Sequence, residues 1–427
     1  MFCISSGIQS ELIKPEREYD LQTSLTDGIN NSNTLLYSKQ EIMLNESRVK
    51  EARAILYPHF GINANVSQFT AQDVYALSPE LGSTLLKPTG EQGDDFYAAR
   101  MSLKKSIYTG GRELSTLRLA KASLERAKSH YQEIKNNIVF EINKGFYELL
   151  YYQQLERIFK EVLSQFESEK ETDKKKYNET LFELKLQSVR AELNARIAEY
   201  QQLSVQARLK FIKTLNIEQG TYISVTGSLS EKSMDNISLS KCLSWSDQFR
   251  PELKQTQFQE EIDALSVNLS MAERYPTVLF GASYEFNGNE FPLDSENWNA
   301  TLSLNFPIFD GWAGWARVRQ KRAQRNQGRY KQAQLTDEVH MEVRQAYSKY
   351  EFWKNQTAPR QKEYNISKGL LSSLQKIYRK GKVAPDEYLN ALVKTAEIEG
   401  RYLEAVKEEL VSLALLEKSM GKLLNGQ

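Results

Sequence analysis

Apolar and polar side chains alternate strictly in several short segments of the chain. The clearest segment runs from Trp298 to Phe306, where Asn, Thr or Ser occupies every second position. A period of two is that of a strand with one apolar and one polar face. We therefore predict strands over about 59–69, 96–107, 277–287 and 298–307.

Most of the remaining chain follows the three-then-four apolar spacing of coiled-coil helices. One such seam starts at Leu117 and another at Leu389, with one interruption at Glu399. At about 1.5 Å per residue, the longest helix would reach on the order of 80–90 Å, which exceeds the diameter of a small domain. On the helices alone, a cytosolic coiled-coil scaffold is the favoured interpretation. The expected helices cover approximately 113–170, 182–215, 314–376 and 386–424.

The apolar faces of the four strands need a cover. A soluble antiparallel sheet shows the same alternation when one face packs on a core, but the polar helices offer no obvious partner layer. Lipid would cover the face if every backbone group were paired, and this requires a closed barrel. Each segment is close to the roughly 9–11 residues that a tilted strand needs to cross a bilayer. Even small barrels need about eight strands, so several chains must contribute.

Composition removes several classes of function. The formal net charge of +1 gives no global reason to expect nucleic acid or an anionic membrane as a partner, so a binding patch would have to be local. Cys3, Cys242 and the three histidines have no metal-ligand spacing, and we expect no cofactor. Without a nucleophile motif or phosphate loop, we expect no enzyme activity. Neither a long apolar run nor an export signal is visible, so the chain is cytosolic or lacks its targeting segment.

The order of strands and helices occurs twice. Pro58 precedes the first strand as Pro276 precedes the third, and Gly110 corresponds to Gly311 at an offset of 201 residues. Each half reads helix, strand, loop, strand, very long helix, turn, long helix. Together with Pro307, these residues mark the corners between strands and helices, where proline and glycine are tolerated.

Four segments carry the repeated pattern: LYPHFGINANV and YPTVLFGASYEF enter strands, LNFPIFDGWAGWARVRQKRAQ leaves one, and YRKGKVAPDEYLNAL lies at a helical turn. Their order resembles that of the TolC-type outer-membrane efflux proteins. The resemblance covers roughly residues 24–424, with the better match in the second half. It implies a mainly α protein with a small β part, whose long antiparallel helices form an α-barrel tunnel. It also implies a homotrimer in which each chain contributes four strands to a twelve-stranded transmembrane barrel.

The resemblance also implies a division of the chain and a function. We expect a passive exit duct in the outer membrane of a Gram-negative bacterium, with a periplasmic tunnel, serving tripartite efflux or type I secretion. The expected partners are further copies of the chain, outer-membrane lipid, a periplasmic adaptor (membrane fusion) protein and an inner-membrane pump of the RND, ABC or MFS type. A non-membrane coiled-coil scaffold is the alternative. The expected parts are an N-terminal extension (1–23), a first repeat (24–215), an equatorial or linker segment (216–248) and a second repeat (249–424).

Family members carry a tyrosine three residues before a glycine at the helical turn, and acidic residues six and nine after it, at a closed periplasmic aperture. In this chain these positions are Tyr378, Gly381, Glu387 and Asn390, and Asp386 adds a carboxylate. In a trimer the carboxylates would form rings that favour cations. They would equally favour the start of the last helix through its dipole, and the two roles are compatible.

The corresponding turn of the first repeat departs from the family pattern. Thr180 stands where the glycine is expected, and no acidic residue lies convincingly at the constriction position. Lys185 is the nearest charged candidate. An ion-pair latch between lysine and acidic residues at the aperture is therefore a hypothesis.

Overall fold

The computed structural model divides the chain into two compact units, which we describe separately. The first unit comprises residues 1–41, 127–255 and 332–427, and the second comprises 42–126 and 256–331. The structure describes residues 17–68, 95–173, 180–218, 220–230, 237–288, 290, 293, 295–380 and 382–422.

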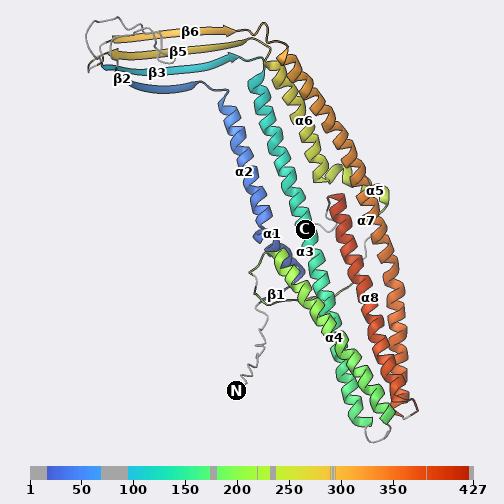
Figure 1. Ribbon diagram of the computed structural model, residues 1–427. Coiled ribbons are helices and arrows are strands. Elements are labelled where there is room, and N and C mark those ends of the chain that lie inside the picture. Colours follow the sequence, from blue (N-terminus) through green and yellow to red (C-terminus); the bar gives the residue numbers. More distant parts are fainter. Residues whose placement is uncertain are drawn as a thin grey trace. The chain divides into compact units, whose positions relative to one another are not determined.

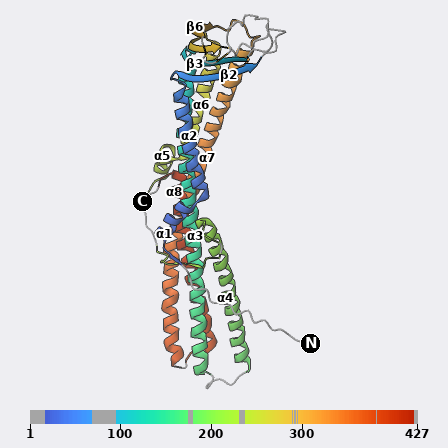
Figure 2. The ribbon, with the colours of Figure 1, turned by 90° about the vertical axis from the view of Figure 1, so that its left-hand side faces the viewer.

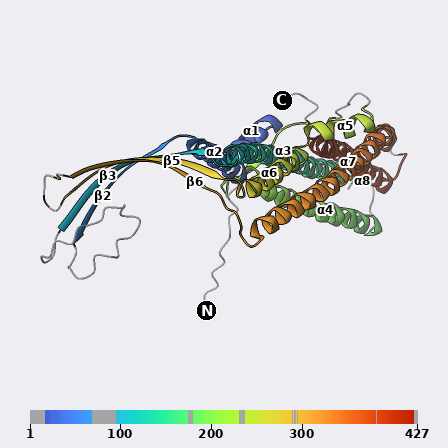
Figure 3. The ribbon, with the colours of Figure 1, turned by 90° about the horizontal axis from the view of Figure 1, so that it is seen from above.

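The second unit contains a four-stranded sheet in the order β2-β3-β5-β6, with every neighbouring pair antiparallel (Figure 1). The four strands curve along their length (Figure 3). Because β2 and β6 are the first and last strands in this order, they are the edges of the sheet. The predicted strands agree with the observed ones within three residues at every end. The strands are β2 (His59–Gln68), β3 (Asp95–Tyr108), β5 (Thr277–Gly288) and β6 (Ser295–Asn305).

The register of this sheet collects the alternating apolar residues on one face. Trp298 pairs with Tyr284, which pairs with Met101, and Ile62 completes the row. The next row lies on the opposite face, where Arg100 Nε donates a hydrogen bond of 2.6 Å to Glu285 Oε2. On the apolar face Trp298 is 76% exposed and Leu302 is 70% exposed. Within one chain, the apolar face of β6 is uncovered.

Four helices lead into and out of the strands of this unit. α2 (Asn33–Ala54) and α6 (Pro251–Ala272) precede β2 and β5, whereas α3 (Arg112–Asp173) and α7 (Ala313–Arg379) follow β3 and β6. Each of the four also extends into the first unit. Val49, Ala52 and Ala120 form a small core between α2 and α3 in the second unit.

The first unit is a helical bundle. The parts of α3 and α7 that belong to it lie beside α4 (Thr180–Leu215) and α8 (Pro385–Met420) (Figures 1 and 2). Its largest core cluster brings Phe146 and Leu149 of α3 together with Phe211 of α4 and Val406 of α8. The predicted long helices agree with α3, α4, α7 and α8 to within four residues at each end.

Several elements of the first unit are absent from the sequence prediction. β1 (Arg17–Tyr19) pairs in parallel with β4 (Ile223–Val225), and α5 (Leu239–Phe249) follows within the segment interpreted as a linker. α1 (Leu21–Asn31) begins within the expected N-terminal extension. Burial stabilises three of these elements. Tyr19 of β1, Ile223 of β4 and Cys242 of α5 lie in hydrophobic clusters to which the long helices contribute most of the residues.

Candidate functional site: the helical turn and the strand-to-helix corners

The turn between the last two long helices lies where the sequence places it. α7 ends at Arg379 and α8 begins at Pro385, a residue whose missing N–H is tolerated in the first turn of a helix. The backbone N–H groups of Lys380 and Lys382 both donate to the carbonyl of Ile377, which closes the end of α7. Gly381, expected at the aperture, lies outside the described residues.

Tyr378 is held in the core beside this turn. Its ring stacks on Tyr388 of α8, with centroids 4.7 Å apart and planes 10° apart, and the two side chains are 8% and 1% exposed. Leu186 of α4 and Phe166 of α3 belong to the same cluster. The predicted gate residue therefore joins the two helices of its own chain. Tyr388 was missed by the sequence reasoning, although its position across the Gly and Pro turn from Tyr378 could have indicated a pair.

Lys185 and Asp386 form an ion pair close to this turn. Lys185 Nζ lies 3.1 Å from Asp386 Oδ2, and the pair links α4 of the first repeat to α8 of the second. Their separation of 201 residues equals the offset between the repeats, so they occupy equivalent positions. The hydrogen bond from Lys185 lowers the pKa of Asp386, and its positive charge adds to the effect. The structure thus brings together two candidates that sequence placed on separate turns.

Glu387 and Asn390 behave differently from Asp386. Both side chains are exposed, and among the described residues neither has a hydrogen-bond or ion-pair partner. The backbone N–H of Glu387 donates to the carbonyl of Ala384, as expected in a first helical turn. In the first repeat, Tyr177 corresponds to Tyr378 at the offset of 201 residues but lies outside the described residues. α4 begins at Thr180.

Further ion pairs tie the helices together above the turn. Arg190 of α4 pairs with Glu167 of α3 at 2.8 Å, and Arg196 of α4 pairs with Glu397 of α8 at 2.7 Å. With Lys185–Asp386, α4 is thus bound on both sides by exposed or half-exposed pairs. Pairs of this kind contribute about 0–1 kcal/mol each, so they fix register more than they add stability.

The corners between strands and helices contain the predicted glycines in left-handed conformation. Gly110 and Gly311 have φ of 62° and 64°. A Cβ on Gly110 would lie 2.6 Å from Cβ of Tyr275, whereas nothing lies within 4 Å of one on Gly311. At the second corner, Asp310 Oδ2 accepts a hydrogen bond of 2.6 Å from the N–H of Gly314 and so caps the start of α7.

The predicted corner prolines lie at strand ends. Pro58 and Pro276 come directly before β2 and β5, and Pro307 comes two residues after β6. Proline has no N–H to donate to a neighbouring strand, so these positions end the ladders without leaving a donor unpaired.

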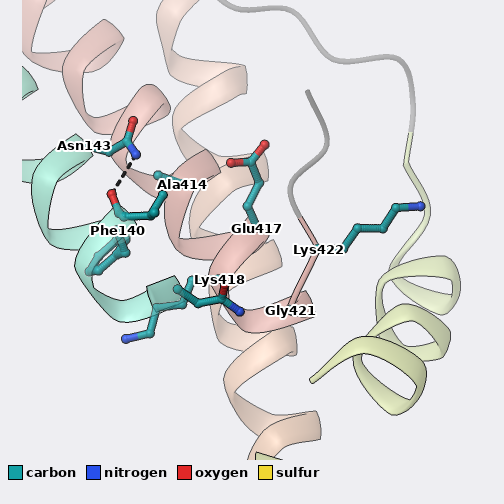
Figure 4. Close-up of a pocket in the computed structure, with 9 residues that line it drawn as sticks. Phe140, Asn143, Ala414, Glu417, Lys418, Gly421 and Lys422 are labelled. Carbon is teal, nitrogen blue, oxygen red and sulfur yellow. Dashed lines mark hydrogen bonds between the residues drawn. The ribbon is translucent and has the colours of Figure 1, made fainter. Parts of the chain in front are cut away.

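Hollows of about 20, 400 and 520 Å³ lie among the described residues of the first unit. The one drawn in Figure 4 lies between α3 and α8 and has a volume of about 20 Å³, room for roughly one water molecule. Asn143 Nδ2 donates to the carbonyl of Val139 beside it, and Lys418 lies over the ring of Phe140.

The described residues contain no cluster of metal-ligating side chains. None of the described helices is apolar enough over a sufficient length to span a membrane.

Residues 244–422, which carry the second turn and the second pair of strands, match the outer membrane efflux protein family. In sequence, this part of the chain is similar to the outer membrane efflux proteins. The resemblance seen in the sequence is thereby confirmed, and the matched half is the one with the better motifs. The family consists of outer membrane efflux proteins and not of enzymes. No curated protein matches the chain in sequence.

Solved structures extend the comparison to the whole fold. The CmeC outer membrane channel of Campylobacter jejuni has a TM-score of 0.78 at 14% identity, over 94% of this chain and 85% of that one. The open state of the MtrE outer membrane channel of Neisseria gonorrhoeae has a TM-score of 0.77 at 16% identity, over 94% and 89%. VceC, an outer membrane protein of Vibrio cholerae, has a TM-score of 0.74 at 12% identity, over 94% and 96%. At identities this low, the structural similarity shows a shared fold. It confirms the expected fold class of long helices, four strands and two repeats.

Proposed function

We propose that three copies of this chain form an exit duct across the outer membrane of a Gram-negative bacterium. Each chain would contribute β2, β3, β5 and β6 to a twelve-stranded barrel, and its long helices to a periplasmic tunnel. The observation that carries the proposal is the sheet itself, with one apolar face and two edge strands. A sheet with free edges is stable in lipid only when those edges are paired.

The polar face of the same sheet supports a water-filled lumen. Its rows contain Asn63, Arg100, Glu285 and Asn297, whose hydrogen-bonding groups would be costly in hydrocarbon. The structures with the same fold include CmeC and MtrE, both described as outer membrane channels. In this proposal the apolar residues face lipid and the polar residues face the conducted solution.

The helical turn is the proposed periplasmic aperture. Glu387 and Asn390 are exposed there and would line the opening, whereas the Lys185–Asp386 pair would hold α8 beside α4 in the closed state. We propose that a periplasmic adaptor and an inner-membrane pump dock at this end and open it, as in tripartite efflux or type I secretion. The duct itself is passive, so the pump would select the cargo.

Purification of the protein from outer membranes in mild detergent tests this function. The protein would be expressed behind a working export signal, its mass measured, and its single-channel conductance recorded in a planar bilayer. We expect a trimer of the 49.2 kDa chain with discrete conductance steps. A protein that stays in solution without detergent and shows no conductance in the bilayer would contradict the proposal and favour the coiled-coil scaffold.

A further inference from the structure

A local excess of positive charge begins where β6 turns into α7. Residues 311–336 contain seven Lys and Arg side chains and no Asp or Glu, although the net charge of the chain is only +1. Three of these cations are neutralised by acidic residues in α6 or directly after it. Arg317 lies 2.9 Å from Glu273, and Glu260 pairs with Arg329 at 2.8 Å and with Arg325 at 3.7 Å.

Arg319 and Arg322 are not neutralised in this way. Both side chains are exposed, and neither has an acidic partner within the described part of the chain. They lie eight and eleven residues after the corner glycine Gly311. Positions three apart share one face of a helix, so the two guanidinium groups extend from the same side of α7.

The first repeat has the same arrangement. Arg118 and Lys121 lie eight and eleven residues after Gly110, both are exposed, and no ion pair joins either to the described residues. Arg126, five residues after Lys121, is instead hydrogen-bonded to Gln259 of α6. The unit thus presents two cation pairs, Arg118/Lys121 and Arg319/Arg322, at equivalent distances from the two corners.

Aromatic side chains lie along the chain between β6 and the Arg319/Arg322 pair. Phe309 and Trp312 are exposed and pack edge to face, 6.3 Å between centroids, and Trp315 carries Arg274 on its ring at 3.5 Å. Along the chain the order is apolar strand face, aromatic corner, cation pair. Hydrocarbon, interface and charged headgroups follow the same order in a membrane leaflet, where Trp and Tyr occupy the interface.

We propose that the two cation pairs bind the phosphate groups of anionic phospholipids in the leaflet on the helix side of the barrel. The inference rests on the proposed function, because the strands must cross the bilayer for the corners to reach its headgroups. Side chains of a helix tilt toward its N-terminus, so all four cations extend back toward the corner. A guanidinium can donate two parallel hydrogen bonds to one phosphate. The positive ends of the α3 and α7 dipoles lie at the same corners and add to the attraction.

Lipid retention measured by native mass spectrometry tests this proposal. The purified protein would be reconstituted in vesicles of phosphatidylcholine alone and with 30% phosphatidylglycerol, at about 50 mM and 500 mM salt, and the retained lipids counted. We expect the protein to retain phosphatidylglycerol in preference to phosphatidylcholine, and high salt to weaken the preference. Arg319→Gln/Arg322→Gln should reduce this preference roughly tenfold, because each cation near a membrane surface attracts anionic lipid. The matched control Arg325→Gln/Arg329→Gln removes the same charge from the same helix and should leave the preference unchanged.

Four outcomes would overturn the inference. Equal retention of both lipids, in a protein that conducts in bilayers, would reject the lipid site and leave the proposed function intact. An equal loss of lipid preference in both double variants would show a general effect of charge and no specific site. Dissociation of the oligomer in Arg319→Gln/Arg322→Gln, with lipid preference unchanged, would assign these cations to contacts between chains. Absence of conductance in every lipid would reject the proposed function together with the inference.

Discussion

Gly110 combines a left-handed backbone with a close contact. Its φ is 62°, and the side chain of Tyr275, which belongs to the other repeat, lies where its Cβ would be. Gly311 has nearly the same φ of 64° but open space around it. Substitutions at these two equivalent corners therefore distinguish the cost of a left-handed backbone from the cost of a contact with Tyr275.

Gly110→Ala should destabilise the protein more than Gly311→Ala. An L-residue in left-handed conformation costs roughly 1–2 kcal/mol, which applies to both variants. Overpacking against Tyr275 and the carbonyl of Ala272 should add about 1–3 kcal/mol at Gly110 only. Thermal denaturation of the purified oligomers measures the difference. Equal losses would show that the contact with Tyr275 does not constrain this corner.

The Lys185–Asp386 pair, like Arg196–Glu397, joins positions of the two repeats that are 201 residues apart. Its partners are half-exposed, so its contribution to global stability is small. Its position beside the turn gives it a local role, because it holds the first turn of α8 against α4. The pKa of Asp386 is lowered, so the attraction is present above the ordinary pKa of aspartate, about 3.9, and is lost as pH falls through the lowered value.

Asp386→Asn should increase the open probability of the channel at neutral pH severalfold. The same increase should appear in the unmodified protein only under strongly acidic conditions, where Asp386 is protonated. Glu167→Gln is a matched control, because it removes one carboxylate of the Arg190 pair farther from the turn. Single-channel recording from pH 3 to 8 measures both. Identical open probabilities of Asp386→Asn and the unmodified protein would show that the pair does not contribute to gating.

At the scale of elements, neighbouring residues of β6 test the two faces of the sheet. Leu302 lies in the apolar row with Phe280, and Ser303 lies on the opposite face beside Leu279. Leu302→Arg should lower oligomer stability by about 2–4 kcal/mol, the cost of a charged residue near the middle of a bilayer. Ser303→Arg should preserve assembly and shift ion selectivity toward anions, because it adds a ring of positive charge to the lumen. Semi-native electrophoresis and reversal potentials measure these effects, and the reverse pattern would invert the assignment of the faces.

The interface of α7 and α8 contains buried polar contacts instead of a continuous apolar seam. Thr357 donates to Glu409 at 2.6 Å, and Ser367 and Thr395 lie 2.9 Å apart. Glu399, where the apolar spacing is interrupted, accepts a hydrogen bond from Tyr364. Burial raises the pKa of Glu399 and raises that of Tyr364 to about 12.

Glu399→Gln should increase thermal stability at pH 7.5. Because the folded-state pKa of this acid is above its unfolded value of about 4.3, its charged form weakens the fold increasingly as pH rises above that value. The gain should therefore shrink as pH is lowered toward 4. Glu397→Gln, two residues away, should have the opposite effect because Glu397 pairs with Arg196. Melting temperatures across this pH range test the sign, and a gain independent of pH would exclude desolvation as the cause.

At the scale of the whole molecule, the edges β2 and β6 require partners from other chains. In a barrel of three chains, β2 of one chain would lie beside β6 of the next. Cysteines placed at Asn63 in β2 and at Asn297, Asn299 or Thr301 in β6, in a background without Cys3 and Cys242, should form disulfides between chains at one register. Denaturing electrophoresis should then show linked dimers and trimers. Single-cysteine variants are the control, and exclusively monomeric chains at every register would contradict closure by three copies.

Much of this fold follows from local periods in the sequence. The alternation in β6 predicts which residues share a face, and the apolar spacing from Leu117 onward predicts α3. Gly311 predicts a left-handed corner because few other residues adopt that conformation readily. These features depend on residues within a few positions of each other, so one sequence contains the necessary information.

The contacts between distant residues could be decided only by the tertiary structure. Tyr378 has the same local sequence whether it lines an opening or packs on Tyr388, and the fold of the hairpin places it in the core. Lys185 meets Asp386 across 201 residues because the two repeats lie together in the first unit, which no periodicity encodes. β1 and β4 are three residues each, too short for a period of two to be recognised, and they form because each supplies hydrogen bonds to the other. The sequence by itself thus determined the long helices, the four strands of the large sheet and their faces, whereas long-range packing decided which of the predicted site residues touch.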